Sequence, residues 1–244
     1  MTQSIGADTE ARSKTAIGAS MRKTMRELIE ARKPDVAIAA AKHRVRVWQN
    51  RRFARTYADL AAQTRYKSAV DFFLTELYSD ADMSARDTDV EKVMPIMIRL
   101  MPAPALRTIR DALAFETLCE RLDADLARQL GHARLTEQSY GDAFRACGQP
   151  GLRCKQIDYV QKVGHALDAL TRWPMLGTTL RLMRGPAKSA GFSVLQEFLE
   201  RGFVAFRHLR GADHFVSTIV ERETAIVKRL FAAHPRPFEL EDPS

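Results

Sequence analysis

The sequence predicts an all-α protein, a multi-helix bundle of about nine or ten helices. Strand signals are nearly absent, because no segment alternates apolar and polar residues over the length of a strand and no Asn-Gly or Asp-Gly pair marks a hairpin. Apolar residues recur instead at helical spacing along most of the chain, in segments separated by glycine and proline. Hydrophobic residues at 45% and charged residues at 28% are ordinary for a globular protein.

The predicted helices begin and end where this periodicity does. Pro34 ends the first helix, Gly131 ends the longest central one, and Thr136 can cap the helix that follows. Pro95 lies inside a predicted helix, where we expect a kink or a restart because proline lacks an amide hydrogen. The ranges are 21–32, 35–62, 64–78, 85–101, 104–130, 136–146, 152–172, 175–184, 192–210 and 212–232.

These helices are expected to form one domain over residues 21–233, with sub-lobes at 21–131 and 132–233 as an alternative. Residues 1–20 are expected to be a disordered tail, and residues 234–244 an extended or disordered one. The apolar stripe of the helix at 104–130 changes face midway, when 100° is advanced per residue. That helix therefore either breaks near Phe115 or packs against different neighbours in its two halves.

The formal net charge of +8 favours an anionic partner, such as an acidic protein, a nucleic acid or a membrane surface. No stretch approaches the ~20 apolar residues that span a bilayer, and the N-terminal segment lacks the apolar core of a secretory signal. Cys119, Cys147 and Cys154 have no metal-knuckle spacing. We therefore expect a cytoplasmic protein with reduced thiols, and we predict neither a metal site nor a cofactor.

Arginines surround a tryptophan on one side of the helix predicted at 35–62. The residues on this side are Arg44, Trp48, Arg51, Arg52 and Arg55. Such a face can bind an acidic partner, clamp phosphates while a base stacks on the indole, or contact acidic lipid headgroups. The alternative is a solvated basic face with the tryptophan half-buried beneath stacked arginines.

The segment "DFFLTELYSDADMSARDTDVEK" at 71–92 begins with a helix whose apolar face includes Phe73, Leu74 and Leu77. Phe72 lies on the other side beside Glu76, so it contacts either a second neighbour in the fold or a binding partner.

The acidic part of this segment, 80–91, matches the calcium-ligand positions of an EF-hand loop. Ala85 stands where the loop requires glycine, and Arg86 adds positive charge beside the cation position. The alternative is a capped helix start, with Ser84 at the N-cap and Asp87 three residues later.

"DFFLTELY" and the following "DTDVEKVMPIMIRLMP" resemble the bacterial family named for its FFLEELY motif. The later "IDYVQKVGHALDAL" and "GADHFVSTIVERETAIVKRLF" are similar to the rest of that family, and the resemblance covers roughly residues 45–232. It implies a helical intracellular bacterial protein of uncharacterised function, and it carries over no catalytic residues.

Glu223 falls at the centre of the apolar face of the helix at 212–232. A buried carboxylate needs a partner, so we expect a salt bridge with an arginine of a neighbouring helix. It could instead make a polar contact in a ligand pocket with Phe198, Phe203 and Phe206, or be exposed on a rotated helix. Such a pocket would suit a haem or an acyl chain.

The stretch "LMRGPAKSAGF" places Arg184 and Lys188 around a Gly-Pro break before a new helix, which can hold an anion or be a plain turn. No recognisable catalytic motif is present. The sequence therefore favours a non-catalytic interaction or regulatory module that binds an acidic partner. Two alternatives stay open: a ligand-binding or enzymatic bundle with an apolar pocket, and a nucleic-acid-binding protein that uses the Arg/Trp face.

Overall fold

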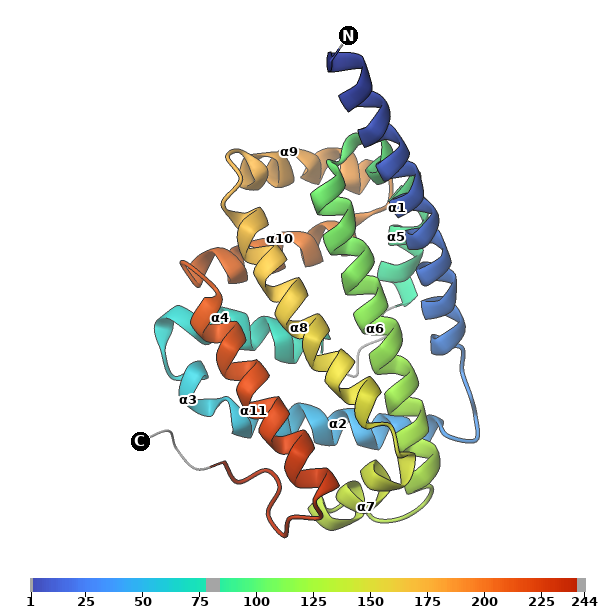
Figure 1. Ribbon diagram of the computed structural model, residues 1–244, viewed down its shortest axis with the longest axis vertical. Helices are drawn as coiled ribbons and strands as arrows, with labels where there is room; N and C mark the ends of the chain where they lie inside the picture. The colour runs from blue at the N-terminus through green and yellow to red at the C-terminus, as the bar shows by residue number, and fades with distance from the viewer. Residues whose placement is uncertain (1, 78–83, 241–244) are drawn as a thin grey trace.

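The computed structural model describes residues 2–77 and 84–240, and this part of the chain is almost entirely helical (Figure 1). It contains eleven α-helices and one π-helical segment, and ten of the α-helices have seven or more residues. The predicted all-α bundle is therefore confirmed. The elements are α1 (Thr2–Arg32), α2 (Ala39–Thr56), α3 (Ala58–Ala61), α4 (Thr64–Phe72), η1 (Phe73–Leu77), α5 (Ser84–Leu100), α6 (Ala103–Leu130), α7 (Glu137–Cys147), α8 (Pro150–Thr171), α9 (Leu176–Ser189), α10 (Ser193–His208) and α11 (Asp213–Phe231).

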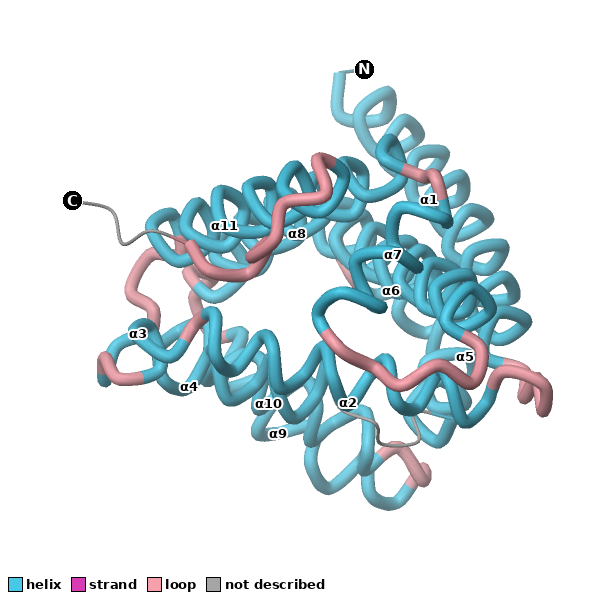
Figure 2. The backbone as a smooth tube through the Cα atoms, turned by 90° about the horizontal axis from the view of Figure 1, so that it is seen from below, coloured by secondary structure: helices cyan, strands magenta, loops and turns pink. Residues whose placement is uncertain are grey.

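The helices form two crossing layers. In Figure 1, α1, α6, α8 and α11 run lengthwise, and α2, α4 and α10 cross behind them. Figure 2 shows the same arrangement from below, with α8 and α11 side by side in one layer and α2, α4 and α10 in the other. Helices α6 and α8 run in opposite directions because the short α7 reverses the chain between them.

The prediction of a disordered tail over residues 1–20 is wrong, because α1 extends from Thr2 through this segment. Ile17 and Met21 are buried and continue the apolar stripe formed by Met25 and Leu28. All four belong to an apolar cluster shared with α5 and α6. Burial against these helices stabilises a segment whose polar composition alone suggested disorder.

Three other boundaries differ from prediction. The helix expected over 35–62 is divided at Tyr57, where φ is −116° and ψ is 22°. The helix expected over 64–78 becomes π-helical from Phe73 to Leu77. Helix α9 continues past the expected end at 184 and includes Pro186, so the predicted Gly-Pro break is absent from it. Pro95 also lies inside a continuous helix, α5.

Helix α6 is unbroken and packs against different neighbours in its two halves, as its shifting stripe predicted. Leu106 and Leu113 join the apolar cluster of α1 and α5. Leu126 and Leu130 join a second cluster, which includes residues of α2, α7 and α11. A third cluster is built from α2, α4, α10 and α11, and Phe73 and Leu74 pack against it as expected. The middle of α6, between two apolar clusters, is where polar side chains turn inward.

Beyond α11 the described residues up to 240 form no helix. Phe238 lies across α2, with its ring centroid 5.1 Å from that of Trp48. The remainder of the tail predicted at 234–244, residues 241–244, lies outside the described residues. The division into one domain or two sub-lobes stays a prediction.

Candidate functional site

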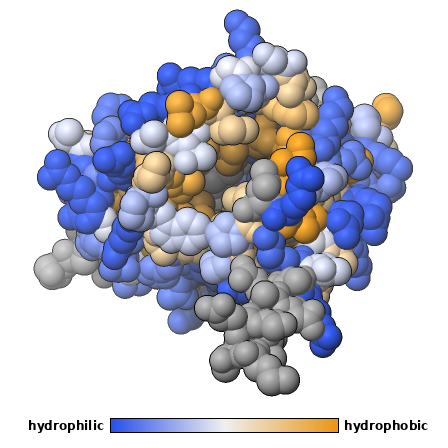
Figure 3. Space-filling model, turned by 90° about the horizontal axis from the view of Figure 1, so that it is seen from above, coloured by the Kyte–Doolittle hydropathy of each residue, from blue (hydrophilic) through white to orange (hydrophobic). Residues whose placement is uncertain are grey.

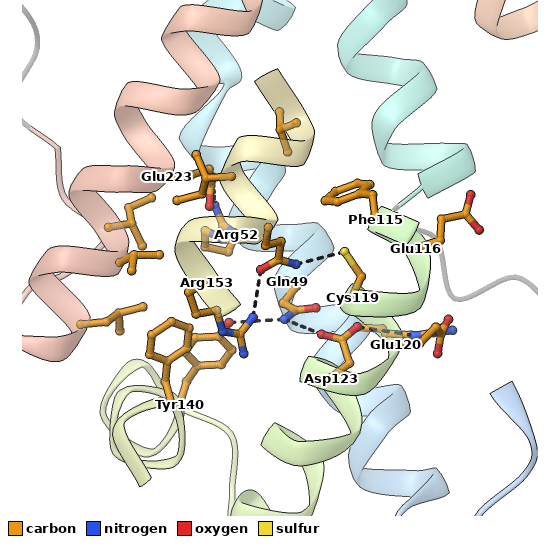
Figure 4. A pocket seen from close by; sticks show the side chains of 18 of the residues that line it. Gln49, Arg52, Phe115, Glu116, Cys119, Glu120, Asp123, Tyr140, Arg153 and Glu223 are labelled. Carbon is orange, nitrogen blue, oxygen red and sulfur yellow. Dashed lines mark hydrogen bonds and ion pairs between the residues drawn. The ribbon is translucent and has the colours of Figure 1, made fainter. Parts of the chain in front are cut away.

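A cavity of about 120 Å³ lies between α2, α6, α7, α8 and α11 (Figure 4). Its wall combines charged side chains with apolar ones, and both kinds come from segments far apart in the sequence. The volume corresponds to roughly four waters, since a water molecule in the liquid occupies about 30 Å³.

Helix α6 supplies one wall of this cavity. Glu116, Cys119, Glu120 and Asp123 recur at helical spacing, so they lie on one face, which is turned toward the interior. Figure 4 shows Cys119 and Asp123 on the side of α6 that faces α8, and Glu116 and Glu120 on the side away from α8. This polar stripe occupies the region in which the apolar stripe changes side.

Glu120 is the anion of a buried ion-pair network. Its side chain is only 5% exposed and pairs with Lys42 at 2.7 Å, with Arg32 at 3.1 Å and with Arg46. Burial alone would raise the pKa of this carboxyl, but the three cations lower it below the ordinary value. Glu120 is therefore held ionised at one side of the cavity.

Asp123, one turn further along α6, has the opposite character. Its Oδ1 accepts a hydrogen bond from Gln49 Nε2 at 3.1 Å, and the same amide donates to the Tyr140 hydroxyl at 3.3 Å. Burial raises the pKa of Asp123, although Arg46 and Arg153 act against this shift. Burial likewise raises the pKa of Tyr140. These groups thus favour their neutral forms more than exposed groups do.

Glu223 forms the salt bridge that the sequence predicted. It pairs with Arg52 of α2, and it accepts a second hydrogen bond from the Tyr57 hydroxyl at 2.7 Å. Burial would lower the pKa of Arg52, yet the Glu223 carboxylate raises it above the ordinary arginine value. The pair joins α2 to α11 at the wall of the cavity.

Three buried arginines on the cavity wall have an N–H group without an acceptor among the described residues. The atoms are Arg52 Nε, Arg86 Nη1 and Arg153 Nη2, and the three residues are 7%, 6% and 5% exposed. A buried donor without a partner costs about 1–3 kcal/mol, and more when it is charged. Three such donors on one cavity therefore indicate an absent acceptor.

Arg153 is the most exceptional of the three. Arg52 pairs with Glu223 and Arg86 pairs with Glu116, but no carboxylate of the described residues lies within 4.0 Å of Arg153. Its guanidinium lies 4.5 Å from the centre of the Phe144 ring, and Nη1 donates to Gln156 Oε1 at 3.2 Å. Arg153 is thus a buried cation without a counter-ion.

The predicted Arg/Trp face does not form one binding surface. Arg44 donates to the Gly131 carbonyl at the end of α6 at 2.6 Å. Trp48 stacks on Tyr140, with ring centroids 4.1 Å apart. Arg52 is buried with Glu223, so its assignment as a partner-binding residue is wrong. Arg51 and Arg55 alone of this set are exposed.

Phe72 is also unavailable to a partner, because it is 7% exposed and packs against Phe198, with ring centroids 5.5 Å apart. Phe72 therefore contacts a second neighbour within the fold, α10, rather than a binding partner; these were the two alternatives that the sequence left open. The pocket predicted from Glu223, Phe198, Phe203 and Phe206 does not form. Among the described residues the cavity wall includes Glu223 but none of the three phenylalanines, and Phe206 belongs to the apolar core.

Arg184 and Lys188 do not form the predicted anion site. Arg184 Nε lies 2.7 and 2.8 Å from the two carboxylate oxygens of Glu200, so it already has a counter-ion. Both cations lie inside α9 rather than at the start of a new helix, because Pro186 does not end α9.

Residues 80–83 of the candidate EF-hand loop lie outside the described residues. In the rest of that loop, Asp87 pairs with Arg32, and Asp89 lies 3.4 Å from the Leu195 amide. Over the described ranges no group of three or more histidine, cysteine or acidic residues is arranged to hold a metal ion.

Of the residues that line the cavity, sequence reasoning identified only Arg52 and Glu223 as site residues; those it missed include Gln49, Cys119, Asp123, Tyr140 and Arg153. One signal was available for α6. Glu116, Glu120 and Asp123 form an acidic stripe at the point where its apolar stripe changes face. No comparable signal marks Arg153, since its burial depends on α7 and α11 closing over the first turn of α8.

The fold and the cavity define a class of protein: an all-helical bundle with a charged interior cavity. A family model described as "Domain of unknown function (DUF8198)" matches residues 28–237, and the chain belongs to this family. No curated protein and no solved structure matches the chain. The resemblance to the FFLEELY-motif family stays a prediction.

None of the helices in the described part of the chain combines the length and the apolar character needed to cross a membrane. The cytoplasmic location expected from the sequence stays a prediction.

Proposed function

We propose that this protein binds a small anionic molecule in the cavity between α2, α6, α8 and α11. The observation that carries the proposal is Arg153, a buried cation without a carboxylate partner among the described residues. An isolated buried charge is very unfavourable, and proteins retain one where a counter-ion or ligand compensates it. The unpartnered Arg52 Nε on the same cavity offers the anion a second donor.

The sequence left open a ligand-binding bundle with a pocket for a haem or an acyl chain. The proposal keeps the ligand-binding class but replaces that ligand with a small anion. Pockets for drug-sized ligands measure about 300–1,000 Å³, whereas this cavity measures about 120 Å³. A haem or a long acyl chain is too large for it. The charges on the wall favour a small polar group instead.

The test is ligand-dependent thermal stability of the full chain. Melting is measured in a buffer free of carboxylate and phosphate, then with acetate, formate or inorganic phosphate added at constant ionic strength. A ligand at a hundred times its Kd stabilises the folded state by about 2.7 kcal/mol. For a chain of this size, that raises the Tm by about 5–11 °C.

Two arginine variants make the test specific. Arg153→Met should abolish the stabilisation by the anion, whereas Arg55→Met, which removes an exposed guanidinium from α2, should leave it unchanged. Native mass spectrometry of freshly purified protein then reports any ligand that is retained. Equal stabilisation of the wild type and of Arg153→Met by every anion would refute the proposal.

Binding of an acidic protein remains a second proposal, on a smaller surface than the sequence suggested. Arg51 and Arg55 are exposed one turn apart on α2, and Arg55 makes only a 3.4 Å contact with Glu137 at the surface. The double variant Arg51→Glu plus Arg55→Glu should lose the partner in a pull-down. The same variant tests the nucleic-acid alternative in a gel-shift assay, and unchanged binding in both assays would exclude this surface.

A further inference from the structure

We infer that the ligand is a small monocarboxylate with a compact apolar body, bound with its carboxylate at Arg153 and its body toward Phe115. This inference rests on the anion site proposed above and adds the chemical class and the orientation of the ligand. Three features of the cavity carry it: the order of side chains along α6 and α8, the balance of charge, and the volume.

The order of side chains gives the cavity two different ends. Because α6 and α8 are antiparallel, higher residue numbers along α6 lie opposite lower residue numbers along α8. Gln156 of α8 donates to Cys119 Sγ of α6 at 3.0 Å, which sets the register. One turn in one direction pairs Arg153 with Asp123, and one turn in the other pairs Val160 with Phe115.

The first of these ends is polar and supplies hydrogen-bond donors. Arg153 Nη2 and Arg52 Nε have no acceptor among the described residues, and both residues line the same cavity as Tyr140. Tyr140 accepts from Gln49, and no described residue accepts its hydroxyl hydrogen. Figure 4 shows Arg153, Tyr140, Gln49 and Asp123 around this end. Two cationic donors and a hydroxyl suit the oxygens of a carboxylate.

The second end is apolar. Phe115, Ile157 and Val160 line it. Figure 3 shows the molecule from above, where apolar residues surround a hollow in the surface. A ligand that placed a second charge here would lose its hydration without gaining a partner.

The charge balance favours one negative charge on the ligand. The other acidic residues of the wall each have a cation: Glu223 has Arg52, Glu120 has Arg46, Glu116 has Arg86, and Glu76 has Arg201 at 3.1 Å. Asp123 lies 3.9 Å from Nε of Arg46, the cation it shares with Glu120, so Arg153 is the arginine of the wall that has no carboxylate within 4.0 Å among the described residues. A monoanion matches this single charge, whereas a dianion such as phosphate leaves an excess negative charge beside Asp123.

The volume sets the size of the ligand body. At about 120 Å³ the cavity is slightly smaller than an engineered apolar cavity of about 150 Å³ that binds benzene. Because the carboxylate takes up part of this volume, a body of about three or four carbons fits, and butyrate is a suitable probe.

The test compares butyrate with acetate and inorganic phosphate by isothermal titration calorimetry on the full chain. Each methylene-sized group in an apolar pocket contributes roughly tenfold or more in affinity. Butyrate, which has two methylenes more than acetate, should therefore bind about a hundredfold more tightly than acetate, and phosphate should bind no better than acetate. Arg153→Met should bind none of the three.

Two further variants test the orientation. Val160→Phe fills the apolar end, so it should lose butyrate and retain acetate, whereas Leu152→Phe adds the same ring at an exposed site of α8 and should change neither. Phe115→Ala enlarges the apolar end and should improve binding of the larger benzoate relative to butyrate. It also serves as the second variant should Val160→Phe not fold.

The outcomes separate this inference from the proposed function. If all three anions bind with similar affinity and all require Arg153, the monocarboxylate inference is overturned and the anion site stands. If no anion binds, or if binding does not depend on Arg153, the proposed function fails together with the inference. Butyrate selectivity that survives both Val160→Phe and Phe115→Ala would overturn the orientation.

Discussion

Replacing Arg153 by methionine should stabilise the ligand-free protein, although it removes the proposed binding site. Arg153 is 5% exposed and has no carboxylate within 4.0 Å among the described residues, so its charge is desolvated without an ion pair. The effective cost of desolvating one charge in a protein is several kcal/mol. Methionine has a similar length and no charge, so it can fill the same space.

The expected gain is the difference between that cost and the interactions that Arg153 makes. The cation–π contact with Phe144 contributes up to about 2 kcal/mol, and the hydrogen bond to Gln156 about 1 kcal/mol. Their loss leaves a net stabilisation of about 1–2 kcal/mol where Asp123 is protonated, because Arg153 also attracts the ionised Asp123 carboxylate. For a chain of this size, this raises the Tm by about 2–8 °C.

The gain should depend on pH, because Arg153 lowers the pKa of Asp123 against the effect of burial. In Arg153→Met that pKa rises further. A carboxyl whose folded pKa is raised contributes stability below its unfolded pKa, and this contribution is lost as the pH rises through the folded pKa. The stabilisation should therefore be larger at pH 5 than at pH 8.

The assay is thermal melting by circular dichroism at both pH values, in a buffer without carboxylate or phosphate ions. Arg52→Met is the matched control, because it deletes a buried arginine that does have a carboxylate partner, Glu223. Breaking that pair should destabilise the fold by about 3–5 kcal/mol. A lower Tm for Arg153→Met in the absence of ligand would refute the argument that its charge is uncompensated.

The remaining predictions concern the network on α6 and the contact of α8 with α11. Glu120→Gln should lower the free energy of unfolding by about 3 kcal/mol at pH 7, because three cations lose their carboxylate. The pKa of Glu120 in the folded protein is lowered, so this loss of stability should disappear as the pH falls through that folded pKa. Urea denaturation at several pH values measures it. A loss of stability that persists below the folded pKa would contradict the argument. Asp123→Asn keeps the acceptor for Gln49 and removes a carboxyl of raised pKa, so at pH 8 it should be at least as stable as the wild type in the same assay. Gly164→Ala should lower the free energy of unfolding by about 1–3 kcal/mol, because the added Cβ would lie 2.6 Å from a side-chain carbon of α11. Gly151→Ala is the control, because its added Cβ has no heavy atom within 4 Å and should not destabilise α8. Equal Tm values for the two variants would show that α8 and α11 are not so closely packed.

Much of the fold could be predicted from the sequence because helical periodicity and local end signals are short-range. Thr136 caps α7 through the Ser139 amide, and Gly131 ends α6 with a φ of 54°, as their positions indicated. The change of face along α6 also predicted that its halves pack against different partners. The failures lie where packing overrides composition: the segment before Met21 is helical because α5 and α6 cover its apolar stripe, and α9 continues through Pro186.

The candidate site was less predictable, since burial of a charge is a property of several helices together. Glu223 was recognisable because a carboxylate interrupts an apolar face, and its salt bridge to an arginine followed from the cost of burying it alone. The sequence could not distinguish Arg52, which is buried, from Arg51 and Arg55, which are exposed, because all three recur within two turns of one helix.

The sequence by itself therefore determined the helices, most of their ends and the need of Glu223 for a partner, since these depend on neighbouring residues along one chain segment. Only the tertiary structure decided which cations are buried and which of them lacks a counter-ion. Arg153 lies in the first turn of α8, whose sequence is typical of a polar surface. Its charge is buried without an ion pair only because α6, α7 and α11 pack around it.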